Sequence, residues 1–88
     1  MRFEWDDEKA QANLEKHGVT FGEATEVFYD PNALGAYDEE HSIDEDRFFI
    51  IGLSSRRLLV VVYAEREGDT VRIISARKAV KKDQEDYE

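Results

Sequence analysis

The chain has 88 residues, enough for one small domain with a thin core, and its 12 basic and 21 acidic side chains give a net charge of −9. It contains no cysteine, which excludes disulfides and thiolate metal sites and is typical of a reducing cytosol. The longest apolar run, residues 58–64, is too short to span a bilayer, and the N-terminus lacks the form of a signal peptide. We therefore expect a single domain over residues 1–88 that is soluble and cytoplasmic.

The acidic total argues against a nucleic-acid-binding protein, but the charges are unevenly distributed along the chain. Residues 1–46 hold 3 basic and 14 acidic side chains, whereas residues 47–82 hold 9 basic and 3 acidic ones. This pattern is compatible with a basic sheet face inside an acidic surface, and also with charges mixed over an ordinary solvated surface.

A short strand and a helix are predicted at the N-terminus. Residues 3–5 alternate in polarity as a strand does, and Asp6 follows as a candidate N-cap for a helix over residues 7–17. Acidic residues in the first turn and basic residues in the last suit the helix dipole, and Gly18 supplies the stop.

A second helix and an irregular acidic segment follow. Residues 20–23 have the capping-box form, and apolar residues recur at helical spacing until the Asp30-Pro31 pair ends the element. Residues 33–37 could form a short strand before the acidic stretch of residues 38–46, and we expect a mobile connection in this part of the chain.

Three runs rich in Val, Ile and Phe predict strands over residues 47–53, 58–65 and 71–77. The connections between them are short enough for hairpins, so the strands should form an antiparallel meander. Residues 79–88 can form a short polar helix. The predicted fold is α+β: two N-terminal helices packed on one face of the antiparallel sheet, with the other face free for binding.

The most informative strand is 71–77, because it contains two arginines in an otherwise apolar run. A guanidinium is not left unpaired in a core, so Arg72 and Arg77 either pair with carboxylates such as Glu45 or Glu65 or face an anionic ligand. Residues five apart on a strand point to opposite faces unless a bulge intervenes. Both alternatives remain open for each arginine.

One flank of the first helix carries Lys9, Asn13, Lys16 and His17 at helical spacing. This flank could bind phosphate, or it could be an ordinary solvated face. His17 is the natural candidate for a general acid or base, since imidazoles titrate near neutral pH. His41 lies in the acidic segment and is expected to be solvated there. That segment lacks the glycine and regular spacing of a calcium loop, so no metal site is predicted.

Several segments together resemble the BrnT family, nearly from end to end. They are Phe3-Glu4-Trp5-Asp6, Lys9, Asn13, Lys16-His17-Gly18-Val19, Phe21, Glu23-Ala24, Glu45-Asp46-Arg47, Ile51-Gly52, Leu59-Val60-Val61-Val62, Glu65-Arg66, Arg72-Ile73-Ile74-Ser75-Ala76-Arg77, Ala79 and Tyr87-Glu88. The Lys-His-Gly-Val and Arg-Ile-Ile-Ser-Ala-Arg segments at this separation are the specific part of the match.

The resemblance implies a toxin of a type II toxin-antitoxin system, namely a RelE-like ribonuclease that inhibits translation by cutting RNA. It also implies a BrnA-type partner, a ribbon-helix-helix antitoxin that neutralises the toxin and represses their operon. Operator DNA would be contacted only through that complex. No metal or organic cofactor is implied for cleavage.

The resemblance also suggests roles for individual residues. Attack by a ribose 2′-hydroxyl needs a base, an acid for the leaving oxygen, and cations for the charge that builds on the phosphate. We expect Arg47, Arg72 and Arg77 to supply the cations, His17 or Glu65 to act as base, and Tyr87 to transfer a proton or stack on a base. The expected RNA-binding residues are Lys9, Asn13, Lys16 and Arg66.

Two departures from the family pattern bear on activity. Many relatives have a histidine where this chain has Tyr63, and an arginine-rich last helix where residues 81–86 read Lys-Lys-Asp-Gln-Glu-Asp. Fewer cations weaken the attraction of phosphate. The chain is therefore expected to be a ribonuclease or, alternatively, a weak or inactive module that still binds the antitoxin.

Overall fold

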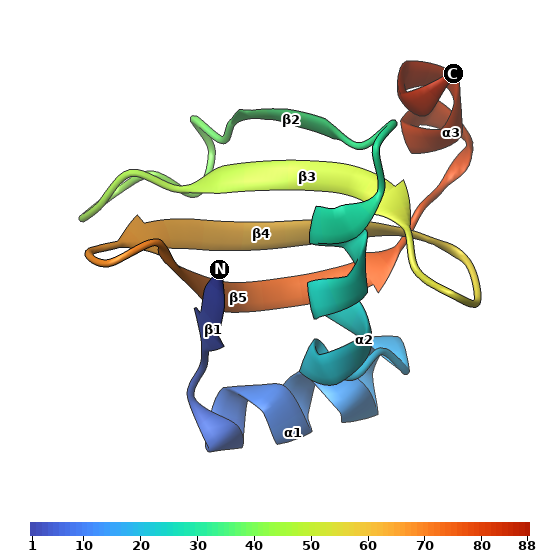
Figure 1. Cartoon of the computed structure of the whole chain (residues 1–88). Helices are drawn as coiled ribbons and strands as arrows, with labels where there is room; N and C mark the ends of the chain where they lie inside the picture. Colours follow the sequence, from blue (N-terminus) through green and yellow to red (C-terminus); the bar gives the residue numbers. More distant parts are fainter.

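Five strands form one sheet in the order β1-β5-β4-β3-β2 (Figure 1). The computed structural model describes residues 1–88. The strands are β1 (Arg2–Glu4), β2 (Leu34–Tyr37), β3 (Phe48–Leu53), β4 (Leu58–Arg66) and β5 (Thr70–Lys78). The helices are α1 (Asp7–His17), α2 (Phe21–Glu26), a 3-10 turn (Val27–Tyr29) and α3 (Lys81–Tyr87). None of these helices has the length and apolar character needed to cross a membrane.

Helix α1 forms as its sequence predicts, and local side-chain chemistry explains both of its ends. The Asp6 Oδ1 atom accepts hydrogen bonds from the backbone N–H groups of Glu8 and Lys9, at 2.8 and 3.1 Å. Gly18 ends the helix in the left-handed conformation, with φ of 69°, which glycine adopts without steric cost.

Helix α2 has only half of the predicted capping box. The Thr20 hydroxyl accepts from the backbone N–H of Glu23 at 3.0 Å. The Glu23 carboxylate does not return to the cap, because it binds Arg57 and Ser54 of the β3–β4 turn instead. The carboxylate therefore joins two distant segments rather than serving its own helix.

The predicted antiparallel meander of the three apolar runs is confirmed, but the sheet as a whole is mixed rather than purely antiparallel. Strands β2 to β5 are antiparallel, but β1 pairs with β5 in parallel, with Phe3 opposite Val71. Two helices separate β1 from the other strands, so no hairpin fixes its direction. Its position is set instead by Phe3, whose ring packs against Phe28 and Tyr29 with centroids 5.3 and 6.2 Å apart.

Helices α1 and α2 cover one face of the sheet, and the core lies between these helices and that face (Figure 1). The buried core residues are Val19, Phe21, Ala24, Val27, Leu59, Val61, Val71, Ile73 and Ala76. The opposite face, which we call the open face, carries the alternate residues of each strand.

A bulge in β5 decides which way the arginines point. Val62 pairs with Ser75 but Tyr63 pairs with Ile73, so Ile74 is an extra residue in β5. Ile73 and Ala76 are consequently both buried in the core although they are three residues apart. Arg72 directly precedes Ile73, and Arg77 directly follows Ala76. Because neighbouring residues on a strand point to opposite faces, both arginines lie on the open face.

Gly52 is a position where β3 approaches the 3-10 turn too closely for a side chain. A Cβ atom there would lie 2.7 Å from Val27 Cγ1 and 3.2 Å from the Val27 carbonyl oxygen. We expect Gly52→Ala to lower the free energy of unfolding by about 1 to 2 kcal/mol, measured by urea denaturation. Gly22→Ala is the control, because its Cβ would meet only Thr20 Oγ1, at 3.9 Å. Equal stability of the two variants would contradict the steric argument.

Candidate functional site

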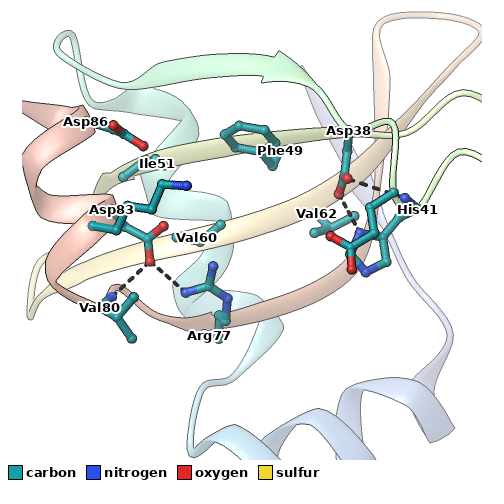
Figure 2. Close-up of a pocket in the computed structure, with 12 residues that line it drawn as sticks. Asp38, His41, Phe49, Ile51, Val60, Val62, Arg77, Val80, Asp83 and Asp86 are labelled. Atoms are coloured by element: carbon teal, nitrogen blue, oxygen red, sulfur yellow. Dashed lines mark hydrogen bonds and ion pairs between the residues drawn. The ribbon is translucent and has the colours of Figure 1, made fainter.

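The open face contains a groove of about 400 Å³ between α3 and the loop that joins β2 to β3, residues 38–47 (Figure 2). Its floor is apolar and is formed by Phe49 and Ile51 of β3 and Val60 and Val62 of β4. Charged side chains surround this floor. They are Asp38, Glu40 and His41 from the loop, Arg77 from β5, and Lys82, Asp83 and Asp86 from α3.

Arg77 is held at the α3 end of the groove by an acid that sequence reasoning missed. Its Nη1 atom donates to Asp83 Oδ2 at 2.7 Å (Figure 2). The same atom donates to the Lys78 carbonyl at 3.2 Å. The same carboxylate oxygen accepts from the Val80 backbone N–H at 2.9 Å. The Arg77 hydrogen bond is the main reason why the pKa of Asp83 is lowered. The guanidinium is thus fixed by one nitrogen, and its other donors remain available to an anion.

A second group of arginines lies towards the other end of the open face and surrounds two carboxylates. Glu45 contacts Arg66 at 3.0 Å and Arg47 at 3.7 Å, and Glu4 contacts Arg72 at 2.9 Å. The hydrogen bond from Arg66 is the main cause that lowers the pKa of Glu45. The Arg47 Nε atom is buried without a hydrogen-bond partner, since 3.7 Å is too long for a hydrogen bond. Three guanidinium groups and two carboxylates leave this arginine group with an excess positive charge.

The two arginine locations are separate points on one face. Arg72 and Arg77 are five residues apart on β5, which corresponds to on the order of 15 Å along a strand. Two anionic groups bound at these arginines would therefore lie about that far apart.

The flank of α1 lies at the β5 edge and not in the groove. Lys9, Lys16 and His17 line a shallow depression with Ile74 and Ser75. His17 is half-buried there, while the two lysines are exposed.

Asn13, which was predicted to bind RNA on that flank, is buried with 7% of its surface exposed. Its Nδ2 atom donates to the carbonyls of Val19 and Ala76 at 3.0 and 2.9 Å, and its Oδ1 accepts from Ala76 N at 3.1 Å. The side chain joins α1 to the β5 edge beyond the end of β1, and its amide is occupied by these backbone groups rather than free to contact RNA.

Glu65 and Tyr87 also lie away from the groove lining. Glu65 is exposed and, as the neighbour of Arg66 on β4, points to the opposite face of the sheet. The Tyr87 hydroxyl donates to Asp30 Oδ2 at 2.6 Å. This hydrogen bond is the main cause both of the raised pKa of Tyr87 and of the lowered pKa of Asp30.

His41 is a groove residue, although the sequence predicted only a solvated side chain. Its Nδ1 atom lies 2.7 Å from Asp38 Oδ2, and its side chain is 50% exposed. The loop that carries it has defined hydrogen bonds, since Ser42 Oγ donates to the Asp38 carbonyl at 2.6 Å and accepts from Arg47 N at 2.9 Å. The expected mobility of this loop stays a prediction. An Asp-x-x-His spacing alone is too common to identify such a pair.

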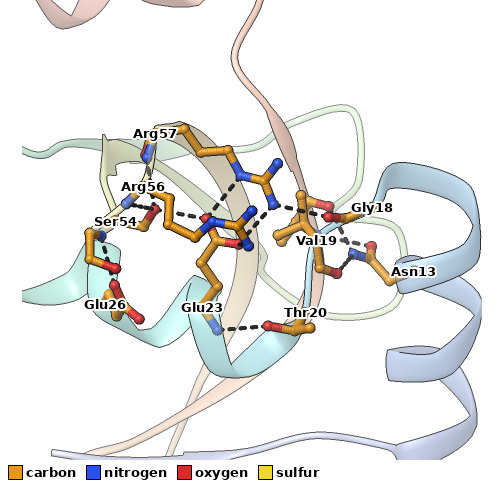
Figure 3. A network of polar contacts seen from close by, with 11 residues as sticks. Asn13, Gly18, Val19, Thr20, Glu23, Glu26, Ser54, Arg56 and Arg57 are labelled. Atoms are coloured by element: carbon orange, nitrogen blue, oxygen red, sulfur yellow. Dashed lines mark hydrogen bonds and ion pairs between the residues drawn. The ribbon is translucent and has the colours of Figure 1, made fainter.

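A further ion pair outside the groove links the β3–β4 turn to the start of α2 (Figure 3). Arg57 donates through Nη2 and Nε to the two oxygens of Glu23, at 2.8 and 3.0 Å, and through Nη2 to the Gly18 carbonyl at 2.9 Å. Ser54 Oγ also donates to Glu23. This network supports the fold rather than a site.

Comparison with known proteins establishes the family. The model of a family described as "Ribonuclease toxin, BrnT, of type II toxin-antitoxin system" matches residues 5–83. The chain belongs to the BrnT family. The sequence resemblance is thereby confirmed, and with it the assignment to the ribonuclease toxins of type II toxin-antitoxin systems.

A solved structure supports the same conclusion at the level of the fold. The crystal structure of the Brucella abortus ribonuclease toxin BrnT matches with a TM-score of 0.71 and 23% sequence identity. The match covers 92% of this chain and 99% of the Brucella chain, so the α+β fold with its mixed sheet is shared. A search of curated proteins found no significant match.

Proposed function

We propose that this BrnT-family chain is an endoribonuclease that cuts RNA on the open face of the sheet and thereby inhibits translation. The supporting observation is the bulge at Ile74, which turns Arg72 and Arg77 to the same face as the groove. Without that extra residue, one of the two arginines would point into the helix-covered core.

The proposed chemistry is attack of a ribose 2′-hydroxyl on the adjacent phosphate. The free donors of Arg77 stabilise the charge that develops on the scissile phosphate, because guanidinium forms strong paired hydrogen bonds to phosphate oxygens. Arg47, Arg66 and Arg72 hold flanking phosphates, and the exposed Lys9 and Lys16 extend the contact at the sheet edge. Phe49 offers an aromatic surface for base stacking.

We further propose that the reaction needs no metal ion and takes place in the cytoplasm. Arginines already supply the positive charge that metal ions supply in other nucleases. The implied partner is a BrnA-type ribbon-helix-helix antitoxin, and operator DNA is contacted only through the toxin-antitoxin complex. A net charge of −9 favours a partner segment that is basic.

A second candidate function is an antitoxin-binding module without cleavage activity. The observation that favours it is the acidic α3, which places Asp83 and Asp86 at the groove. Carboxylates there weaken the attraction of RNA phosphates.

Expression in bacterial cells distinguishes the two functions. We expect the parent chain to arrest growth and fragment cellular RNA, and co-expression of a BrnA-type antitoxin to restore growth. An Arg72→Ala/Arg77→Ala variant should do neither, while an Arg56→Ala control should behave as the parent, since Arg56 is 70% exposed in the β3–β4 turn. If circular dichroism shows that the parent is folded, yet cells grow normally and their RNA stays intact, the binding module is favoured.

A further inference from the structure

The groove has an imidazole at one end and a guanidinium at the other. Figure 2 shows His41 and Asp38 near Val62, whereas Arg77 lies with Asp83 and Val80 at the opposite end. We propose that His41, oriented by Asp38, is the general base of RNA cleavage in this chain. The inference rests on the ribonuclease function proposed above and assigns the base within it.

The hydrogen bond to Asp38 fixes which ring nitrogen can accept a proton. An ionised carboxylate can only accept, so the Nδ1 atom of His41, at 2.7 Å from Asp38 Oδ2, carries the hydrogen. In the neutral ring, Nε2 then holds the free lone pair. The structure shows no hydrogen-bond partner for Nε2, and half of the side chain is exposed to the groove and solvent.

The spacing along the floor suits one ribose and its phosphate. Arg77 pairs with Val60, and Phe49 pairs with Val62, two residues further along β4. Two residues of strand correspond to about 7 Å. Figure 2 shows His41 near Val62, so a ribose whose phosphate is held by Arg77 would lie over the apolar floor, between the guanidinium and the imidazole.

The other candidate bases lie outside this arrangement. His17 lines the depression at the β5 edge, and Glu65 points to the opposite face. The Tyr87 hydroxyl donates a hydrogen bond to Asp30. Among the residues that line the groove, His41 is the only imidazole.

The proposed step balances without a co-reactant. The His41 Nε2 atom takes the 2′-hydroxyl proton as the 2′-oxygen forms a bond to phosphorus and the bond from phosphorus to the 5′-oxygen breaks. The leaving 5′-oxygen takes a proton from water, and the proton on His41 returns to solvent. The products are a 2′,3′-cyclic phosphate and a free 5′-hydroxyl.

The groove contains one imidazole, that of His41. The remaining charged groups that face it are Asp38 and Glu40 from the loop, Arg77 from β5, and Lys82, Asp83 and Asp86 from α3, while β3 and β4 contribute only apolar side chains. Carboxyl, ammonium and guanidinium groups ordinarily titrate outside the range of about pH 5 to 8 in which an imidazole does. The cleavage rate should therefore rise with pH across that range.

The test is the single-turnover rate of cleavage of a mixed-sequence oligoribonucleotide by the purified chain between pH 5 and 9. We expect His41→Gln to lower the rate at pH 8 by about 100-fold and to abolish the rise with pH. Asp38→Asn should lower it by about 10-fold, because the amide no longer holds the imidazole in one tautomer. Asp44→Asn removes an exposed carboxylate from the same loop and is the matched control for charge.

Two outcomes would overturn the assignment while leaving the ribonuclease function intact. One is an active parent whose rate and pH profile survive His41→Gln in a variant that circular dichroism shows to be folded. The other is loss of the pH-dependent rise in His17→Gln instead. A folded parent that does not cut RNA at any pH would overturn the proposed function itself.

Discussion

Replacement of Arg77 by alanine is expected to lower the single-turnover rate of RNA cleavage by about 100- to 1000-fold. Rate losses in that range are usual when an enzyme loses one preorganised hydrogen-bond donor to an anion that develops in the transition state. The guanidinium is fixed on one side by Asp83 at 2.7 Å and presents its other donors to the groove. Arg77→Lys keeps the charge but loses the planar fork, so it should recover only part of the rate.

The controls for Arg77 separate chemistry from folding. Arg56→Ala also removes one guanidinium, but from an exposed position in the β3–β4 turn, and should cleave at the parent rate. Because Arg77 also binds Asp83, thermal unfolding of each variant shows whether α3 is still in place. A folded Arg77→Ala variant that cuts as fast as the parent would contradict the role of this arginine.

Replacement of Glu23 by glutamine is expected to lower the free energy of unfolding by about 2 to 3 kcal/mol. The Glu23 side chain is 8% exposed and accepts hydrogen bonds from Arg57 and Ser54. Glutamine offers one neutral oxygen in place of two charged ones, so the Arg57 guanidinium loses one of its two hydrogen bonds to this side chain and the charge that opposed its own. Urea denaturation at pH 7 measures the loss. Glu26→Gln is the control, since Glu26 is an exposed residue of the same helix and its hydrogen bond from Ser55 N needs only the oxygen that glutamine keeps.

The Glu23 effect should depend on pH in a defined direction. The hydrogen bond from Arg57 is the largest cause of the shift and outweighs burial, so the pKa of Glu23 lies below its ordinary value of 4.5 in the folded state. A depressed pKa contributes stability above the ordinary value and loses it as the pH falls through the folded value. The difference between parent and Glu23→Gln should therefore shrink as the pH falls below the ordinary value of 4.5 and through the lower folded-state pKa. A difference that stays constant with pH would exclude the ion pair as its source.

Local signals account for the elements that the sequence predicted well. The ends of α1 follow from Asp6 and Gly18, whose effects act within one helical turn. The three apolar runs correspond to β3, β4 and β5 within one residue at each end. Here the information lies in neighbouring residues, and tertiary packing agrees with it.

The features that were missed depend on contacts between distant parts of the chain. Asn13 has ordinary helical spacing, but its amide binds the backbone of Ala76, 63 residues away. Glu23 fits a capping box and instead binds Arg57, 34 residues away. The parallel pairing of β1 and the extra residue Ile74 likewise follow from how separate elements pack. The spacing of residues within one helix or strand does not predict which distant residues they contact.

The candidate site was predictable only in part, because some of its residues are positioned by distant parts of the chain. Arg77 was identifiable because a guanidinium in an apolar strand requires an anion, whatever the fold. His41 was not, because its relation to the groove depends on the path of the β2–β3 loop across the open face. The face shared by Arg72 and Arg77 depended on a bulge that the sequence left open.

The most direct test is incubation of the purified chain with an oligoribonucleotide and its all-deoxy counterpart in the presence of EDTA. We predict fragments of the RNA that end in a 2′,3′-cyclic phosphate, an intact DNA strand, and no RNA fragments with Arg77→Ala. RNA that stays intact with the folded parent, or fragments that form equally with Arg77→Ala, would contradict metal-independent cleavage on the open face of the sheet.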